Sequence, residues 1–360
     1  MTIFRCSHTL LHGRGDPGTT PPIHPNVQLA CPMHHGDITP QIARGLLALQ
    51  ARIKAARIPS SKLDETVNVA IWNIREFGKK KRTDTAIHYI AEILGQFDLI
   101  AIVELRDDLT DLGRVLPILG EYWDVVYSDW TADSGGNNER IAYLFDTRAV
   151  VFNGFAAEVD APREKRGTEY LARQSFWRAP YMCSFRAGNF DFIVITTHAR
   201  WGDSIPGRKA ELQLLADWID TRFRDKSVED HDLIVMGDFN VPALDDPLYS
   251  ALTSRGLQIP LPLRKLKVGD QVIGGTNLDE SARYDQILHL PTVPANFMRA
   301  GGTLDFFIDD AHIAELFPDK KCTRQQFSFQ LSDHLPLWIQ IKTDIDGFRL
   351  NQIVQDRRRP

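Results

Sequence analysis

Four apolar segments of the chain end in polar side chains of the kinds that bind metals or transfer protons. They are VAIWN, ending in Asn73; LIAIVE, ending in Glu104; FIVITTH, ending in His198; and LIVMGDFN, which contains Asp238 and Asn240. Gly-Asp and Asn-x-Pro also form turns, so the last segment alone is compatible with a simple strand end. Strand ends on one edge of an α/β sheet lie close together, and ligands bind there. The four endings together therefore predict one polar site.

Two further segments add an acid and an acid–imidazole pair. Asp285 lies in RYDQIL, and Asp333 and His334 lie in LSDHLPLW. Carboxylate and amide oxygens, with no cysteine close by in the sequence, suit Mg²⁺, with Mn²⁺ as a substitute, rather than zinc. Mg²⁺ prefers one or two carboxylates together with substrate phosphates, so this set predicts a phosphate ester as substrate. Histidines paired with carboxylates would transfer the protons that hydrolysis requires.

The elements that must position these side chains are short apolar strands alternating with helices. Strands are predicted over 67–74, 97–105, 123–128, 140–146, 179–186, 190–198, 231–239, 283–290 and 333–341. The spacing of apolar residues predicts helices over 84–97 and 207–223. Several strands are apolar along their whole length, which indicates burial on both faces. The pattern predicts a layered α/β sandwich with two central sheets covered by helices.

Three parts are expected along the chain. Residues 1–60 form an N-terminal extension, in which Thr39 and Pro40 begin an amphipathic helix. The basic residues of this helix form either a solvated face or a nucleic-acid contact. Residues 61–345 form the main domain, and residues 346–360 form a basic C-terminal tail.

Charge and cysteine content restrict the class of protein. The formal net charge is −5 and the isoelectric point is about 6.1, so a nucleic acid would be held by bound cations or by local basic runs, at 79–82, 263–270 and 357–359. The four cysteines form no CxxC pair, which fits a reducing compartment. The N-terminal segment lacks the apolar core of a secretion signal, and no apolar run is long enough to span a bilayer. We expect a cytoplasmic protein without a membrane partner.

Eight short motifs between residues 67 and 342 resemble, in this order, the endonuclease/exonuclease/phosphatase superfamily and, within it, the deoxyribonuclease I branch. They are NIREFG (73–78), VELRD (103–107), NERIAYLFD (138–146), WRAP (177–180), TTHARWGD (196–203), GDFN (237–240), YDQIL (284–288) and SDHLPL (332–337). GDFN or SDH alone is a weak signal, whereas eight motifs in order are specific. The resemblance implies a four-layer α/β sandwich with two central mixed β-sheets flanked by helices, and hydrolysis of phosphate esters.

The resemblance also implies roles for individual residues. The implied metal ligands are Glu104, the principal one, with Asn73, Asp238, Asn240 and Asp333. The implied catalytic residues are Glu139, His198, Asp238, Asn240, Asp285 and His334. His334 would pair with Asp285, and His198 with Glu139, on either side of the phosphate. One pair activates water and the other protonates the leaving 3′ oxygen, and the sequence leaves open which pair does which.

Arginines are the residues that the resemblance places against the substrate: Arg75, Arg106, Arg178 and Arg200. Arg178 would contact the phosphate, and Arg75 and Arg106 would approach the minor groove. The sequence departs from that branch at Asn137. In the deoxyribonuclease I branch this position holds an aromatic residue that stacks on deoxyribose. It also departs over residues 160–177, which stand in place of a closely spaced cysteine pair. Not all groove contacts of that branch are therefore carried over.

These observations predict a Mg²⁺-dependent phosphodiester hydrolase and favour a DNA endonuclease. One alternative is a phosphatase or phosphodiesterase that acts on RNA, a phosphoinositide or another small phosphate ester. Another is a binding protein with an inactive nuclease fold. The complete set of acids, amides and histidines opposes the inactive protein, and the basic runs favour a polyanionic substrate over a small one.

Overall fold

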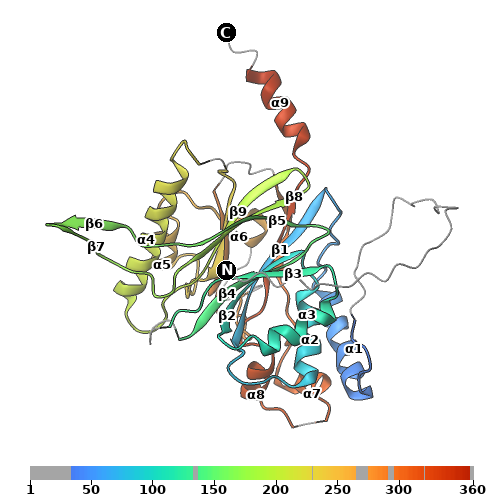
Figure 1. Ribbon diagram of the computed structural model, residues 1–360. Helices are drawn as coiled ribbons and strands as arrows, with labels where there is room; N and C mark the ends of the chain where they lie inside the picture. Colours follow the sequence, from blue (N-terminus) through green and yellow to red (C-terminus); the bar gives the residue numbers. More distant parts are fainter. Residues whose placement is uncertain are drawn as a thin grey trace, which may run out of the picture.

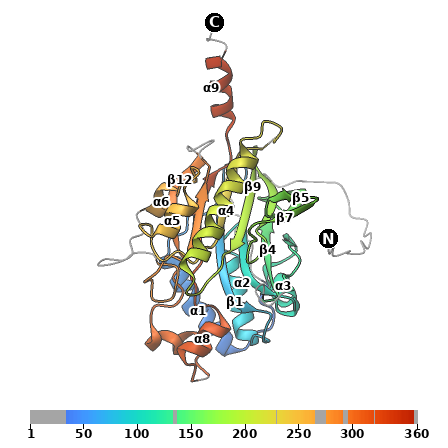
Figure 2. The same ribbon diagram turned by 90° about the vertical axis from the view of Figure 1, so that its left-hand side faces the viewer.

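Two β-sheets packed face to face form the centre of the molecule, and helices cover the outer face of each sheet (Figures 1 and 2). The computed structural model describes residues 34–132, 137–228, 230–264, 275–290, 296–319 and 321–356. The four-layer α/β sandwich with two mixed sheets is therefore confirmed.

The first sheet has the strand order β12-β13-β1-β2-β4-β3. Its strands are β1 (Thr66–Phe77), β2 (Leu99–Arg106), β3 (Trp123–Tyr127), β4 (Glu139–Asp146), β12 (Phe297–Thr303) and β13 (Leu337–Lys342). β1 is central, parallel to β2 and antiparallel to β13. In this register Asn73 lies opposite Val103, so it is next to Glu104 at the ends of two parallel strands.

The second sheet has the strand order β11-β10-β9-β8-β5. Its strands are β5 (Val151–Glu158), β8 (Tyr181–Ala187), β9 (Phe190–His198), β10 (Leu233–Asp238) and β11 (Asp285–His289). β10 is parallel to β9 and antiparallel to β11. Asp238 is opposite His198 on one side and Asp285 on the other, which puts three candidate residues in one row across the sheet.

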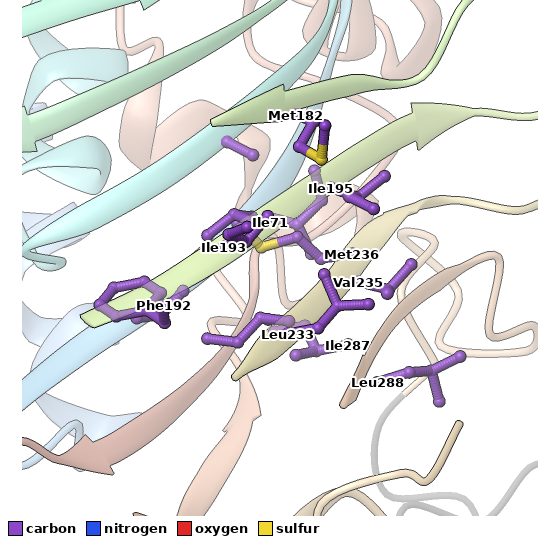
Figure 3. Packing of buried hydrophobic residues seen from close by; sticks show 14 of the residues in the cluster. Ile71, Met182, Phe192, Ile193, Ile195, Leu233, Val235, Met236, Ile287 and Leu288 are labelled. Atoms are coloured by element: carbon purple, nitrogen blue, oxygen red, sulfur yellow. The ribbon is translucent and has the colours of Figure 1, made fainter. Parts of the chain in front are cut away.

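β1 shows how alternation of side chains builds two cores from one strand. Val67, Val69 and Ile71 belong to the core that the two sheets share, and Ala70, Trp72 and Ile74 belong to the core under the helices. Figure 3 shows Ile71 in the shared core with residues of the second sheet, among them Ile193, Ile195 and Met236. Because Asn73 continues the odd-numbered series, its side chain points between the sheets, toward Asp238.

Helices cover the outer face of each sheet. The helical segments are α1 (Pro40–Ala55), α2 (Asp84–Leu94), α3 (Thr110–Leu119), α4 (Ile205–Phe223), α5 (Pro247–Leu252), α6 (Leu261–Arg264), the 3-10 turn Asp310–His312, α7 (Ile313–Leu316), α8 (Arg324–Gln330) and α9 (Asp346–Asp356). α4 and α5 lie on the second sheet, α2 and α3 lie on the first, and α9 projects from the body (Figure 1). No helix in the described ranges is both long and apolar enough to span a membrane.

Helix α1 packs into the core under the first sheet. Thr39 caps it, with Oγ1 accepting a hydrogen bond from the Ile42 N–H at 3.3 Å. Leu46 and Leu49 are buried in the same cluster as residues of α2 and α7. Arg52 is also buried and donates to the Phe306 carbonyl at 2.7 Å, so this basic residue belongs neither to a solvated face nor to a nucleic-acid contact.

The structure contains strands that the sequence pattern does not predict. β5 is an edge strand with mainly exposed residues, and β12 contains two glycines. Two further strands, β6 (Arg163–Arg166) and β7 (Glu169–Ala172), form a polar hairpin with no apolar face. One predicted strand is shorter than expected. The strand predicted over 333–341 begins only at Leu337, because Asp333 and His334 lie in the preceding loop.

Substitution of Leu49 by alanine tests whether α1 is part of this core. Leu49 is 0% exposed, so Leu49→Ala should lower the free energy of unfolding by about 2–4 kcal/mol. Leu47 on the same helix is 67% exposed, and Leu47→Ala should change it by less than about 0.5 kcal/mol. Urea denaturation measures both values. Equal, small effects would show that α1 does not contribute to the core.

Candidate active site

The carboxylate of Asp238 lies between two histidine rings. The Nε2 atoms of His198 and His334 are each 3.8 Å from the same oxygen, Asp238 Oδ2. His198 ends β9, beside Asp238, whereas His334 comes from the loop before β13 in the other sheet. The two imidazoles thus approach one point from opposite sides.

Each ring is held from behind by a buried carboxylate. Nδ1 of His198 lies 2.8 Å from Glu139 Oε2, and Nδ1 of His334 lies 2.7 Å from Asp285 Oδ2. A ring nitrogen that faces an ionised carboxylate carries the proton in the neutral imidazole. Nε2 is then the atom that each ring presents to the site.

Asn73 connects the two sheets at this point. Its Nδ2 donates to Glu104 Oε1 in the first sheet and to Asp238 Oδ2 in the second, at 3.0 Å in each case. Ser332 supports the same junction, because its Oγ donates to the Asn73 carbonyl at 2.6 Å and accepts from the His334 N–H at 3.0 Å. Ser332 is fully buried, and its position directly before the Asp-His pair is the sequence signal that would have identified it.

A β-bulge turns Glu104 toward the site. Ile100 and Ile102 face the helices, so regular alternation would also point Glu104 toward the helices. The register of β2 shifts between Ile102 and Leu105, and Glu104 has a φ of 62°. Bulges of this kind redirect side chains next to functional sites. The Glu104 carboxylate consequently meets Asn73 and also accepts the Glu76 N–H at 2.8 Å.

The Gly-Asp-Phe-Asn segment is both a turn and part of the site. A side chain at Gly237 would overlap the backbone of Thr197 on the adjacent strand, so only glycine fits. The Asn240 N–H donates to Asp238 Oδ1 at 2.9 Å, as in an Asx turn, with Asn240 at a φ of 53°. Asn240 Nδ2 donates to the Ala199 carbonyl at 3.0 Å. The turn fixes the orientation of the Asp238 carboxylate.

Two of the four arginines surround Glu139. Arg178 Nε lies 2.7 Å from Glu139 Oε2, and a nitrogen of the buried Arg106 lies 3.8 Å from Glu139 Oε1. The side-chain amide of Asn137 also donates to Glu139 Oε1, at 3.0 Å. These contacts orient the carboxylate that holds His198.

The other two arginines lie apart from this cluster. Arg75 pairs with the half-exposed Asp333 at 3.3 Å and stacks over the Phe329 ring. The Arg200 guanidinium stacks over Trp177, 4.5 Å from the ring centroid. Arg75 and Asp333 therefore line the edge of the site near His334, and the Arg200 guanidinium packs on Trp177.

Charges within the site shift the pKa values of its members. Burial raises the pKa of Glu104, but the charge of His198 and hydrogen bonds from Asn73 and Glu76 outweigh it and lower the pKa to about 2. Burial and the Arg178 guanidinium lower the pKa of His198, and the carboxylates of Glu139 and Asp238 more than compensate, so the pKa is raised.

The same balance operates at the second histidine. Burial lowers the pKa of His334, and the carboxylates of Asp285 and Asp238 raise it well above its ordinary value. Before any cation binds, both rings therefore hold a proton more strongly than free histidine does. Protonation of either ring would in turn stabilise the carboxylates around it.

The oxygen atoms of the site fit a divalent cation. Asn73 Oδ1 and Asp285 Oδ1 are buried and accept no hydrogen bond from the described residues. Ligand atoms of Asp238, Asp285 and His334 lie within 4.8 Å of one another. Buried acceptors without partners cost free energy that a bound cation would recover. Such a set beside two paired imidazoles defines a metal-dependent hydrolase of phosphate esters.

Comparison with known proteins gives the family. Residues 70–334 match the profile of the Endonuclease/Exonuclease/phosphatase family, so the chain belongs to this family. A deoxyribonuclease from Thioalkalivibrio sp. (strain K90mix) is 27% identical over 300 residues, which cover 78% of this chain and 72% of that protein. Deoxyribonuclease-1 of Equus caballus is 29% identical over 182 residues, which cover 49% of this chain and 61% of that protein.

A solved structure shows the same fold. The endonuclease/exonuclease/phosphatase from Bacteroides vulgatus matches 77% of this chain and 98% of its own, with a TM-score of 0.50 and 14% identity. The curated relatives are longer than the matched part of this chain, which spans about three-fifths of the horse enzyme. The chain is a hydrolase of phosphate ester bonds.

Exchange of each paired carboxylate for its amide tests the two histidine environments separately. Glu139→Gln should lower the pKa of His198, because burial and Arg178 still disfavour its charged form. Asp285→Asn should lower the pKa of His334 and leave that of His198 in place. NMR titration of the imidazole C–H signals in metal-free protein measures both values, with His198→Ala and His334→Ala for assignment. The pairing would be contradicted if Glu139→Gln lowered the pKa of His334 instead of that of His198, or if Asp285→Asn lowered the pKa of His198 instead of that of His334.

Proposed function

We propose that this protein is a Mg²⁺-dependent DNA endonuclease. The observation that carries the proposal is the approach of two carboxylate-held imidazoles to the single Asp238 carboxylate, at 3.8 Å from both sides. Hydrolysis of a phosphodiester needs one group that removes a proton from water and another that protonates the leaving oxygen. Two imidazoles that present Nε2 to the same carboxylate oxygen meet this need.

Asn73, Glu104 and Asp238 are the residues that would hold the cation, with Asp285, Asn240 and Asp333 around them. Mg²⁺ bound there would supply a Lewis acid that offsets the negative charge of the phosphate. All of these side chains offer oxygen, which suits Mg²⁺ and Mn²⁺. The low pKa of Glu104, about 2, keeps this carboxylate ionised at neutral pH.

The two rings have complementary tasks in the proposed reaction. Nε2 of one imidazole accepts a proton from the attacking water, whose oxygen forms the new bond to phosphorus. The bond from phosphorus to the 3′ oxygen breaks, and Nε2 of the other imidazole gives this oxygen a proton. His198 and His334 lie at the same distance from Asp238, so either ring fits either task.

Two pockets beside the site leave room for a substrate larger than a single phosphate group. One, of about 540 Å³, is lined by Lys79, Arg106 and Asn137; the other, of about 450 Å³, is lined by Arg75 and His334. Each pocket also holds two acids, Asp107 and Asp108 in the first and Asp279 and Asp333 in the second, which offset its cations. A bound divalent cation would therefore offset most of the charge of a polymeric phosphodiester at this site.

Only part of the basic run at 79–82 is available to contact a nucleic acid. Lys79 pairs with Glu76, and Lys80 lies 5.6 Å from the centroid of the Phe329 ring. Arg82 is buried and donates to the Arg75 carbonyl, so it supports the fold and is not available to a nucleic acid. In the run at 263–270, Arg264 donates to the Ile259 carbonyl at 3.1 Å, and residues 265–270, like the arginines at 357–359, lie outside the described residues.

One observation favours a second candidate, a phosphodiesterase that acts on RNA or a small phosphate ester. Asn137 occupies the position where the deoxyribonuclease I branch has an aromatic residue, and its side chain is engaged with Glu139 at 3.0 Å. No ring at this position can stack on deoxyribose. Contacts elsewhere must then distinguish DNA from other phosphate esters.

Cleavage of supercoiled plasmid, linear duplex, single-stranded DNA and RNA tests the proposal. With Mg²⁺ the protein should nick plasmid, and EDTA should abolish the activity. His198→Ala removes a proton-transfer group and Asp238→Ala removes the shared carboxylate. Each substitution should reduce the rate about 10²–10⁴-fold. Agarose-gel quantification of nicked plasmid measures the rates.

His312→Ala is the matched control, because His312 is a partly exposed histidine paired with Asp309 outside the site. It should leave the rate unchanged within about two-fold. If folded protein with Mg²⁺ or Mn²⁺ cuts RNA or a nucleotide ester but no DNA, the DNA endonuclease proposal is wrong and the second candidate takes its place.

A further inference from the structure

The β6–β7 hairpin projects from the second sheet without a core of its own (Figure 1). All residues of its two strands are exposed. A two-residue turn joins the strands, with Gly167 at a φ of 63°, and the register pairs Arg166 with Glu169. Isolated two-stranded hairpins are only marginally stable in water, so this arm gains little from folding alone.

Both ends of the arm are attached beside the His198–Glu139 pair. Glu158, which precedes the arm, and Arg178, which follows it, line one small pocket together with Glu139 and His198. The Val159 N–H donates to the Pro180 carbonyl at 2.8 Å and closes the base of the arm. The arm is therefore anchored at the edge of the site that His198 and Glu139 form.

The register of the hairpin separates its side chains into two different faces. Arg163 pairs with Ala172, and Lys165 pairs with Tyr170, so these four share a face. That face carries two cations and an aromatic ring, which is 65% exposed, and no acid. Arg163 has an exposed ion pair with Asp160 at 3.6 Å at the base of the arm, a kind of pair that contributes little in water.

The opposite face is electrically balanced. It carries Glu164, Arg166, Glu169 and Leu171, and Arg173 at the end of the arm pairs with Glu164 at 2.5 Å. Two cations and two acids thus offset each other on this side. Only one face of the arm is complementary to a polyanion.

We propose that the face of Arg163, Lys165 and Tyr170 contacts the backbone of a double-stranded DNA substrate away from the scissile phosphate. This inference rests on the proposed endonuclease function. A two-stranded ribbon fits the width of the major groove, cations neutralise phosphates, and an exposed ring supplies contact area. The arm would provide duplex contacts that Asn137 does not.

Two triple variants with matched changes test the proposal. Arg163→Ala/Lys165→Ala/Tyr170→Ala removes two cations and the ring from the proposed face. Arg166→Ala/Arg173→Ala/Leu171→Ala removes two cations and one large apolar side chain from the opposite face. Both variants lose the same net charge, so long-range attraction of DNA changes equally in both. The measurements are kcat/KM on a 40-base-pair duplex between about 50 and 200 mM NaCl, and on bis(p-nitrophenyl) phosphate.

The ratio of duplex to small-ester kcat/KM should fall about ten-fold in the first variant and stay within about two-fold in the second. The slope of log kcat/KM against log salt should become shallower by about 2 in the first variant, since each phosphate contact contributes about 0.9. If the parent enzyme cuts DNA and both variants show the same ratio and the same salt slope, the proposed role of the arm is wrong, and the endonuclease proposal still stands. A parent that hydrolyses the small ester but no duplex would overturn the endonuclease proposal as well.

Discussion

The hydrogen bonds of the Asn73 side chain are the point on which the two halves of the site depend. One amide nitrogen contacts Glu104 in its own sheet and Asp238 in the other, each at 3.0 Å. Bonds of this length across an interface require the sheets to keep a fixed position, and the apolar core that they share, with Val69 and Ile71, provides it. The packing of the sheets thereby brings two mutually repelling carboxylates within reach of one cation.

The carboxylates at this junction share a small set of cationic or imidazole partners. Glu139, Asp238 and Asp285 are buried, and each has a cationic or imidazole partner: Arg178 and His198, both histidines, and His334 respectively. An isolated buried carboxylate would be costly, and loss of one partner leaves its counterpart uncompensated. The residues that prepare the site for chemistry are thus also necessary for its stability.

The sequence predicts the layers and the polar strand ends because both depend on local patterns. Apolar runs of strand length give the sheets, and side-chain types give a hard-oxygen site. It cannot reveal that Glu104 reaches the site only through a bulge, since alternation alone would point this residue toward the helices. The burial of Arg52 and Arg82 also depends on tertiary contacts that charge patterns do not encode. The β6–β7 hairpin has no apolar period, so no sequence signal predicts it.

The odd–even alternation of β1 determines where this chain tolerates changes in length. One residue inserted between Val67 and Asn73 would exchange the two faces of the strand, and Trp72 would take the place of Asn73 between the sheets. In the arm between Glu158 and Arg178, by contrast, residues added in cross-strand pairs lengthen the hairpin without moving either end. Insertions and deletions in homologous chains should therefore accumulate in this arm and be excluded from β1.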